Sequence, residues 1–168
     1  NPAIELIDLE LVASVAKKHG KLLIVDNCFA TPYLQQPINY GADLVVHSAT
    51  KYMDGQGRVL GGVTVGRKEL INDIYLFGRL TGPSMSPFNA WVLSKSLETL
   101  ALRMDRHCSN ALFIAESLEK NSKLENVSYP LLQSHPNYNI AKKQMRAGGG
   151  IITVTVKGGL DEAKKFLD

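Results

Sequence analysis

The stretch HSATKYMDGQGRVLGG, residues 47–62, follows directly on the apolar run ADLVV at 42–46. Such a run is typical of a buried strand. It ends in S-A-T-K and then in a loop that carries four glycines. A charged amine beside an apolar core is unfavourable, so Lys51 either reaches solvent or has a function. The stretch therefore predicts a strand whose carboxyl end presents a lysine.

Apolar strands alternate with helices and loops around this stretch. Helical spacing of leucines and valines predicts a helix over 5–19, and short apolar runs predict strands over 21–25, 42–47 and 62–66. A serine followed by proline predicts the start of a long helix that runs from 87 to about 120 with a bend. Near-continuous apolar strands of this kind favour an α/β fold with a largely parallel sheet.

The character of the sequence changes after residue 122. A short helix is expected near 138–146, a strand over 151–156 and the start of a helix over 159–168, with three glycines at 148–150. This part reads as the opening of a second α/β unit. The region 31–37, with its prolines, is expected to be a loop.

Composition bounds the class of protein. The 168 residues are 45% hydrophobic and 21% charged, with a net charge of +3, which is typical of a globular domain. The basic residues are interspersed with acidic ones, which argues against nucleic-acid binding. No apolar run reaches the roughly 18 residues of a membrane span. Cys28 and Cys108 have no metal-ligand spacing, which favours a reduced, cytoplasmic setting and predicts no metal.

Two polar clusters follow the first two predicted strands of the sheet. Asp26 follows one strand, and Ser48, Thr50 and Lys51 follow the next. In open α/β sheets, ligands bind at the carboxyl ends of strands. An aspartate can pair with a protonated ring nitrogen, hydroxyls can bind phosphate oxygens, and a lysine can form a Schiff base. The plainer alternatives are a surface lysine at 51, a helix or turn cap at Asp26, and ordinary turn hydroxyls at Ser48 and Thr50.

The glycines do not form a nucleotide-binding motif. Residues 55–61 miss the dinucleotide pattern G-x-G-x-x-G by one position and precede a strand instead of a helix. Residues 61–66 have the Walker spacing of glycines, but Arg67 stands where that motif needs lysine. For Gly61 and Gly62, a turn and close approach of a ligand both remain open.

Three segments carry a resemblance to a known family: VDNCFATPYLQQP at 25–37, GADLVVHSATKYMDGQGRVLGG at 41–62 and TGPSMSPFNAWVLSKSLETLALRMDRH at 81–107. They resemble the Cys/Met-metabolism family of pyridoxal-phosphate enzymes. The resemblance implies the fold-type I (aspartate aminotransferase-like) α/β architecture, with a mostly parallel sheet and flanking helices. It also implies that residues 1–122 belong to the large cofactor-binding domain and 123–168 to the start of the small C-terminal domain.

The resemblance assigns five residues to pyridoxal 5′-phosphate. Lys51 is expected to form the Schiff base and then to shuttle protons, and Asp26 to pair with the pyridine nitrogen. Ser48 and Thr50 are expected to bind the phosphate, and Asn1 to bind the 3-oxygen of the ring.

The loop after the lysine points to a branch of the family. D-G-Q-G-R-V-L-G-G at 54–62 is similar to the O-succinylhomoserine sulfhydrylase branch, which implies γ-replacement of succinate by sulfide to give homocysteine in methionine biosynthesis. The alternatives are a cystathionine γ-synthase, an O-acetylhomoserine sulfhydrylase, or a methionine or cystathionine γ-lyase. Ser96 stands where relatives usually have glycine, and a local packing effect is expected there.

The partners implied are a homoserine ester and sulfide or cysteine, with a homotetrameric assembly and neither nucleic acid nor membrane. Because the chain begins at Asn1 and not at Met and ends early in a predicted helix, it is expected to be an internal fragment that is inactive by itself. Two non-enzymatic alternatives remain: a binding module that carries the cofactor without catalysis, and a phosphate-binding interaction domain without the cofactor.

Overall fold

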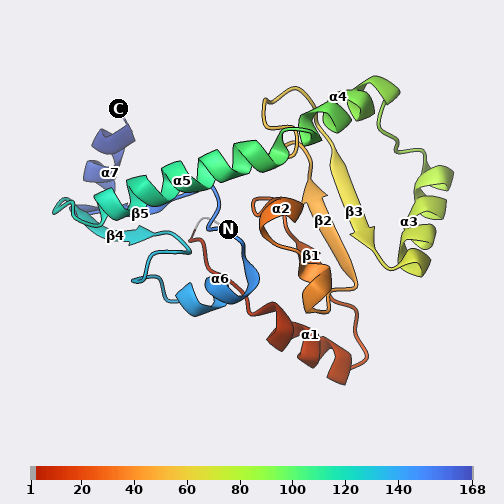
Figure 1. Cartoon of the computed structure of the whole chain (residues 1–168), viewed down its shortest axis with the longest axis horizontal. Coiled ribbons are helices and arrows are strands. Elements are labelled where there is room, and N and C mark those ends of the chain that lie inside the picture. Colours follow the sequence, from red (N-terminus) through yellow and green to blue (C-terminus); the bar gives the residue numbers. More distant parts are fainter. Residues whose placement is uncertain (1–2, 168) are drawn as a thin grey trace. The chain divides into compact units, whose positions relative to one another are not determined.

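The computed structural model describes residues 3–167. They form two compact units (Figure 1): one covers 7–104, and the other combines 3–6 with 105–167. Among the described residues, none of the helices has the length and apolar character needed to cross a bilayer.

The first unit contains a three-stranded sheet. Its strands are β1 (Ile24–Asp26), β2 (Leu44–Ser48) and β3 (Gly62–Gly66), and Figure 1 shows β2 between the other two. β1 and β2 are parallel, with Asp26 opposite Val46. The carboxyl ends of β1 and β2 therefore meet at the same edge of the sheet.

The α/β class expected from the sequence is confirmed, but β3 pairs differently from the largely parallel pattern. It lies antiparallel to β2, with Ser48 opposite Gly62. Parallel pairing needs a crossover connection, usually a helix. The segment 49–61 instead forms a turn and a loop, so the chain returns along β2 in the opposite direction.

The helices of this unit match the sequence in part. α1 (Leu9–Lys18) lies inside the predicted range 5–19, and the Asp8 side chain caps it by accepting from the Leu11 N–H at 3.1 Å. The expected loop at 31–37 contains instead the short helix α2 (Thr31–Leu34) and the start of a 3₁₀ turn, η1 (Pro37–Tyr40).

Three further helices follow β3. α3 (Lys68–Thr81) is absent from the sequence prediction and contains no buried residue. The predicted long helix is present as α4 (Pro87–Leu97) and α5 (Leu100–Leu118), and the expected bend is a break at residues 98–99. Ser86 caps α4 as predicted, since its side chain accepts from the Asn89 N–H at 3.1 Å.

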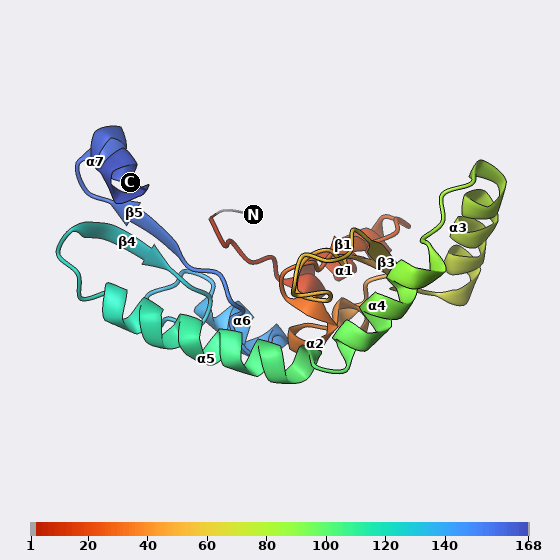
Figure 2. The same cartoon turned by 90° about the horizontal axis from the view of Figure 1, so that it is seen from above.

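The second unit packs a strand pair against α5. β4 (Leu124–Ser128) and β5 (Thr153–Val156) are antiparallel, and Figure 2 shows them beside α5. Its remaining helices are α6 (Tyr138–Gln144) and α7 (Gly159–Leu167). The core of the unit joins two alanines of α5 to residues of β4 and the segment after it: Ala111, Ala115, Val127, Tyr129 and Leu132.

Tyr129 is the centre of this core. Its ring is fully buried, and its hydroxyl donates to the carbonyl oxygen of Gly149 at 3.0 Å. Burial raises the pKa of Tyr129, so the phenol stays protonated and able to donate. A Cβ on Gly148 would lie 2.6 Å from the ring. The tyrosine therefore requires glycine at 148.

We expect Gly148→Ala to lower the free energy of unfolding by about 1 to 3 kcal/mol, because the methyl group overpacks a buried ring that has no room to move. Gly78→Ala in α3 is the control, since the nearest atom to its new Cβ would be 4.0 Å away. Alanine should stabilise that helix by about 0.5 to 1 kcal/mol. Urea unfolding of both variants checks the opposite signs, and equal effects would contradict the packing argument.

His47 in β2 predicts a pH dependence of stability. It is buried, and its Nδ1 lies 3.2 Å from the carbonyl oxygen of Asn27, which can only accept, so Nδ1 carries the hydrogen. Burial lowers the pKa of His47, and this outweighs the opposing effects of the Asn27 carbonyl and the Asp26 charge.

Below about pH 6.5 the unfolded chain therefore binds a proton at this position more readily than the folded protein does. Stability from this group is present above that pH and is lost as the pH falls. We expect the unfolding free energy of wild type to fall from pH 7.5 to 5.5 more steeply than that of His47→Gln. Equal slopes in urea titrations would contradict this.

Candidate functional site

The polar residues predicted to act together lie at one edge of the sheet. Asp26 is the last residue of β1 and Ser48 the last residue of β2, and these strands are parallel. Thr50 and Lys51 follow in the turn that leaves β2. Asn1 lies outside the described residues. The structure thus brings four of the five predicted residues to the carboxyl edge of one strand pair, where α/β folds bind ligands.

Cys28 joins the two strand ends. Its Sγ accepts from the Ser48 N–H at 2.8 Å, and its own N–H donates to Oδ1 of Asp26 at 3.0 Å. Burial, followed by a hydrogen bond to Asp26, raises the pKa of the Cys28 thiol, while the Ser48 N–H and the charge of Lys51 lower it. The thiol therefore interacts electrostatically with both Asp26 and Lys51.

The two hydroxyls differ in their partners. Oγ1 of Thr50 accepts from the Gly61 N–H at 3.1 Å and donates to the Gly61 carbonyl oxygen at 3.3 Å. The Ser48 hydroxyl makes no hydrogen bond to any residue in 3–167. Ser48 is thus free to donate to a ligand, whereas Thr50 holds the start of β3.

The glycines of the loop have separate uses. Gly55 and Gly57 have φ values of +74° and +68°, so these two meet the need for a left-handed backbone. Gly61 pairs with Thr50 and Gly62 begins β3. Of the two possibilities for Gly61 and Gly62, the turn with positive φ is not found at these positions, since the positive φ values lie at Gly55 and Gly57.

The turn at residues 49–55 carries Lys51. The Asp54 N–H donates to the Ala49 carbonyl at 2.9 Å, and the Gly55 N–H donates to the Lys51 carbonyl at 2.8 Å. Ala49 and Met53 are buried against Leu93 of α4. The side chain of Lys51 is exposed and has no ion pair within 3–167. One side of the turn is therefore packed, while the lysine amine points to solvent.

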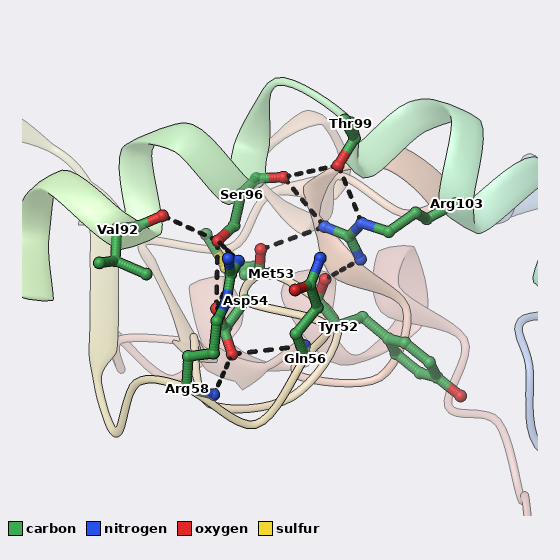
Figure 3. Close-up of polar contacts among 9 residues, drawn as sticks. All are labelled: Tyr52, Met53, Asp54, Gln56, Arg58, Val92, Ser96, Thr99 and Arg103. Carbon is green, nitrogen blue, oxygen red and sulfur yellow. Dashed lines mark hydrogen bonds and ion pairs between the residues drawn. The ribbon is translucent and has the colours of Figure 1, made fainter.

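Asp54, which belongs to this turn, is fully buried, and Figure 3 shows its polar contacts. Its carboxylate accepts from the backbone N–H groups of Arg58 at 2.7 Å and Gln56 at 3.4 Å, and from the Ser96 hydroxyl at 3.1 Å. The Arg58 guanidinium is 3.2 Å away. Burial alone would raise the pKa of Asp54, but these hydrogen bonds and the Arg58 charge lower it. Asp54 is therefore ionised and satisfied, and it closes the loop 54–58.

Arg103 of α5 holds the end of the same turn (Figure 3). Its Nη1 donates to the Tyr52 carbonyl at 2.7 Å, and its Nη2 donates to the carbonyls of Met53 at 3.3 Å and Ser96 at 3.0 Å. Its Nε donates to the Thr99 hydroxyl at 3.1 Å. One guanidinium thus pairs with the last carbonyls of the Lys51 turn and with the end of α4.

Sequence reasoning missed this group of buried polar residues. Asp54 and Arg58 stood out only as part of a branch-specific loop, and Ser96 only as a departure from glycine with a packing effect. The structure shows more than packing at Ser96, because its hydroxyl contacts Asp54 and accepts from Arg58 at 2.8 Å. The available signal was the spacing of Asp54 and Arg58, four residues apart, together with a polar Ser96 in an apolar helix.

Comparisons with known proteins cover the whole chain. Residues 1–168 match the family described as Cys/Met metabolism PLP-dependent enzymes. The O-succinylhomoserine sulfhydrylase of Pseudomonas aeruginosa is 50% identical over 168 residues, which are 100% of this chain and 42% of that protein. The L-methionine gamma-lyase of Pseudomonas putida is 45% identical over 170 residues, which cover 100% of this chain and 43% of that protein.

A solved structure agrees with these relatives. The cystathionine gamma synthase of Xanthomonas oryzae pv. oryzae, in complex with aminoacrylate and cysteine, is 37% identical and superposes with a TM-score of 0.96. The match covers 100% of this chain and 44% of that one. The chain thus spans less than half the length of the proteins it matches. With a family match over its full length, the chain belongs to the Cys/Met metabolism family of PLP-dependent enzymes.

Proposed function

We propose that the protein containing this chain replaces the γ-substituent of O-succinylhomoserine with sulfide, giving homocysteine and succinate in methionine biosynthesis. The observation that carries the proposal is the meeting of Asp26 and Ser48 at one sheet edge, with Lys51 in the turn that follows. The 50% identity to an O-succinylhomoserine sulfhydrylase supports the choice of reaction. The proposal makes the whole protein a transferase of the cytoplasm, with a homotetrameric assembly.

The groups at this edge fit pyridoxal phosphate, on which the family depends. They comprise an exposed amine, a carboxylate and a hydroxyl without a partner in 3–167. When bound, the cofactor supplies an electron sink that stabilises negative charge at the substrate Cα. This set contains one group for each reactive part of the cofactor: the amine for the aldehyde, the carboxylate for the ring nitrogen and the hydroxyl for the phosphate.

Each residue has a separate role in the proposal. Lys51 holds the cofactor covalently and, once released, moves a proton between Cα and Cβ of the substrate. Asp26 keeps the ring nitrogen protonated by its negative charge. Ser48 donates to the phosphate, and Thr50 joins it by exchanging its 3.3 Å bond to the Gly61 carbonyl for a charged acceptor. Asn1 serves the 3-oxygen of the ring.

We also infer that residues 1–122 belong to the large cofactor-binding domain and that 123–168 begin the small C-terminal domain. The compact unit 7–104, which contains Asp26, Ser48, Thr50 and Lys51, falls inside the first of these ranges.

An assay of the whole protein tests the reaction. O-succinylhomoserine and O-acetylhomoserine are each supplied with sulfide or with cysteine, and methionine is supplied alone. We expect homocysteine from the succinyl ester with sulfide. Release of methanethiol from methionine would instead identify a γ-lyase, and cystathionine formed with cysteine would identify a cystathionine γ-synthase.

Lys51→Ala should abolish the visible absorbance of the lysine-bound cofactor and lower turnover at least about 100-fold, because the proton-transfer group is lost. The measurement is borohydride reduction followed by peptide mapping, with wild type expected to carry the pyridoxyl label at residue 51. Lys68→Ala, an exposed lysine at the start of α3, is the control. Label on another lysine of the wild type would overturn the assignment.

Ser48→Ala should weaken cofactor binding roughly 10- to 150-fold, which corresponds to one hydrogen bond to a charged group of about 1.5 to 3 kcal/mol. Thr50→Ala should have a smaller effect, because Thr50 is already paired with Gly61. Equilibrium dialysis against pyridoxal phosphate measures both, and the exposed Ser94→Ala in α4 is the control. A larger loss for Thr50→Ala would reverse the two roles.

A further inference from the structure

The exposed side chain of Lys51 is positioned through its backbone. Since the amine has no ion pair among residues 3–167, its place depends on the turn 49–55. That turn has few bonds of its own. The Gly55 N–H pairs with the Lys51 carbonyl, but the carbonyls of Tyr52 and Met53 come at the end, where no further turn supplies donors.

The Arg103 guanidinium supplies those donors. It reaches Tyr52 at 2.7 Å and Met53 at 3.3 Å, and it also holds the Ser96 carbonyl at 3.0 Å, where α4 ends. We propose that Arg103 is the positioning residue of Lys51, fixing the turn so that the amine stays directed at the reacting atoms.

The buried carboxylate of Asp54 completes this support. It holds the opposite side of the turn through Ser96 and Arg58, and its charge favours the charged form of Arg103 against the effect of burial. Ser96 belongs to both halves, because its carbonyl accepts from Arg103 and its hydroxyl contacts Asp54. The break between α4 and α5 is thereby tied to the Lys51 turn.

The geometry at Gly55 shows how closely Arg103 approaches. A Cβ on Gly55 would lie 2.2 Å from Nη1 of Arg103. Gly57 has a similar φ, +68° against +74°, yet its Cβ would meet nothing within 4 Å. Alanine at either glycine strains the backbone alike, but alanine at 55 alone also displaces the guanidinium. The chain therefore contains a matched pair of substitutions.

This inference rests on the function proposed above, and its test separates the two. The whole protein is prepared as wild type, Arg103→Gln, Gly55→Ala and Gly57→Ala, with Arg106→Gln as the control for charge on α5. Cofactor-free protein is mixed with pyridoxal phosphate. The rate of covalent attachment at residue 51 is followed by absorbance and by borohydride labelling, and kcat and KM are measured separately.

We expect Arg103→Gln and Gly55→Ala to slow attachment and to lower kcat about 10- to 100-fold with KM within threefold, since small misplacements of a reacting group are costly. Gly57→Ala and Arg106→Gln should stay within threefold of wild type. Arg103→Lys, which keeps the charge but not the fork, should restore part of the loss.

The destabilised Gly148→Ala, in the other unit, shows whether reduced stability alone changes kcat. Wild type without label at residue 51 would defeat the proposed function itself. Label at residue 51 together with unchanged attachment and kcat in Gly55→Ala would overturn the role of Arg103 alone, and this holds even where Arg103→Gln does not fold.

Discussion

The turn after β2 has to satisfy two opposing demands. It must leave the amine of Lys51 exposed, and it must keep its own peptide groups paired against a buried face formed by Ala49 and Met53. Two backbone bonds inside the turn do not use all of its carbonyls. The guanidinium of Arg103 resolves this, because it pairs with several carbonyls at once from the buried side. The Lys51 side chain is therefore exposed to solvent on the other side of the turn.

The edge of the sheet answers a similar demand with a thiol. β1 ends at Asp26, which lies opposite Val46, so β1 has no backbone carbonyl opposite the Ser48 N–H of β2. Sγ of Cys28 takes that place at 2.8 Å, while the Cys28 N–H holds the Asp26 carboxylate. The two residues proposed to meet opposite ends of the cofactor are thus coupled through one residue between them.

Local patterns predicted the parts of the fold that depend on local chemistry. The apolar run before Lys51, the serine cap at 86 and the helical spacing before residue 20 all correspond to observed elements. α3 was missed although its apolar residues recur at helical spacing, as those of α1 do. It lacks only a start signal, because no side chain caps it at Arg67. The period was therefore available in the sequence, and the missing cap removed the signal that marks where the helix begins.

The prediction of a loop at 31–37 was wrong for a different reason. Its prolines signal a loop, but the buried Asn27 binds the Thr31 carbonyl at 3.0 Å and the Gln35 carbonyl at 2.8 Å, and so stabilises α2 in place. The bonds of Arg103 to residues about 50 positions earlier belong to the same class. Side-chain bonds to distant backbone leave no period in the sequence, so the strand-end residues could be predicted while their supports could not.

Ser96 shows how the branch-specific loop and the helix break depend on each other. Asp54 is buried, so it needs every donor that surrounds it, and Ser96 and Arg58 both contribute. Glycine at 96 would remove a hydrogen-bond donor from Asp54 and an acceptor from Arg58. A loop without Asp54 would leave the buried Ser96 hydroxyl with the Val92 carbonyl oxygen, at 2.8 Å, as its acceptor. The D-G-Q-G-R loop and the serine therefore form one hydrogen-bonded unit, although Arg58 and Ser96 are 38 residues apart in the sequence. The departure from glycine at 96 is explained by the loop at 54–58, and neither is explained by packing alone.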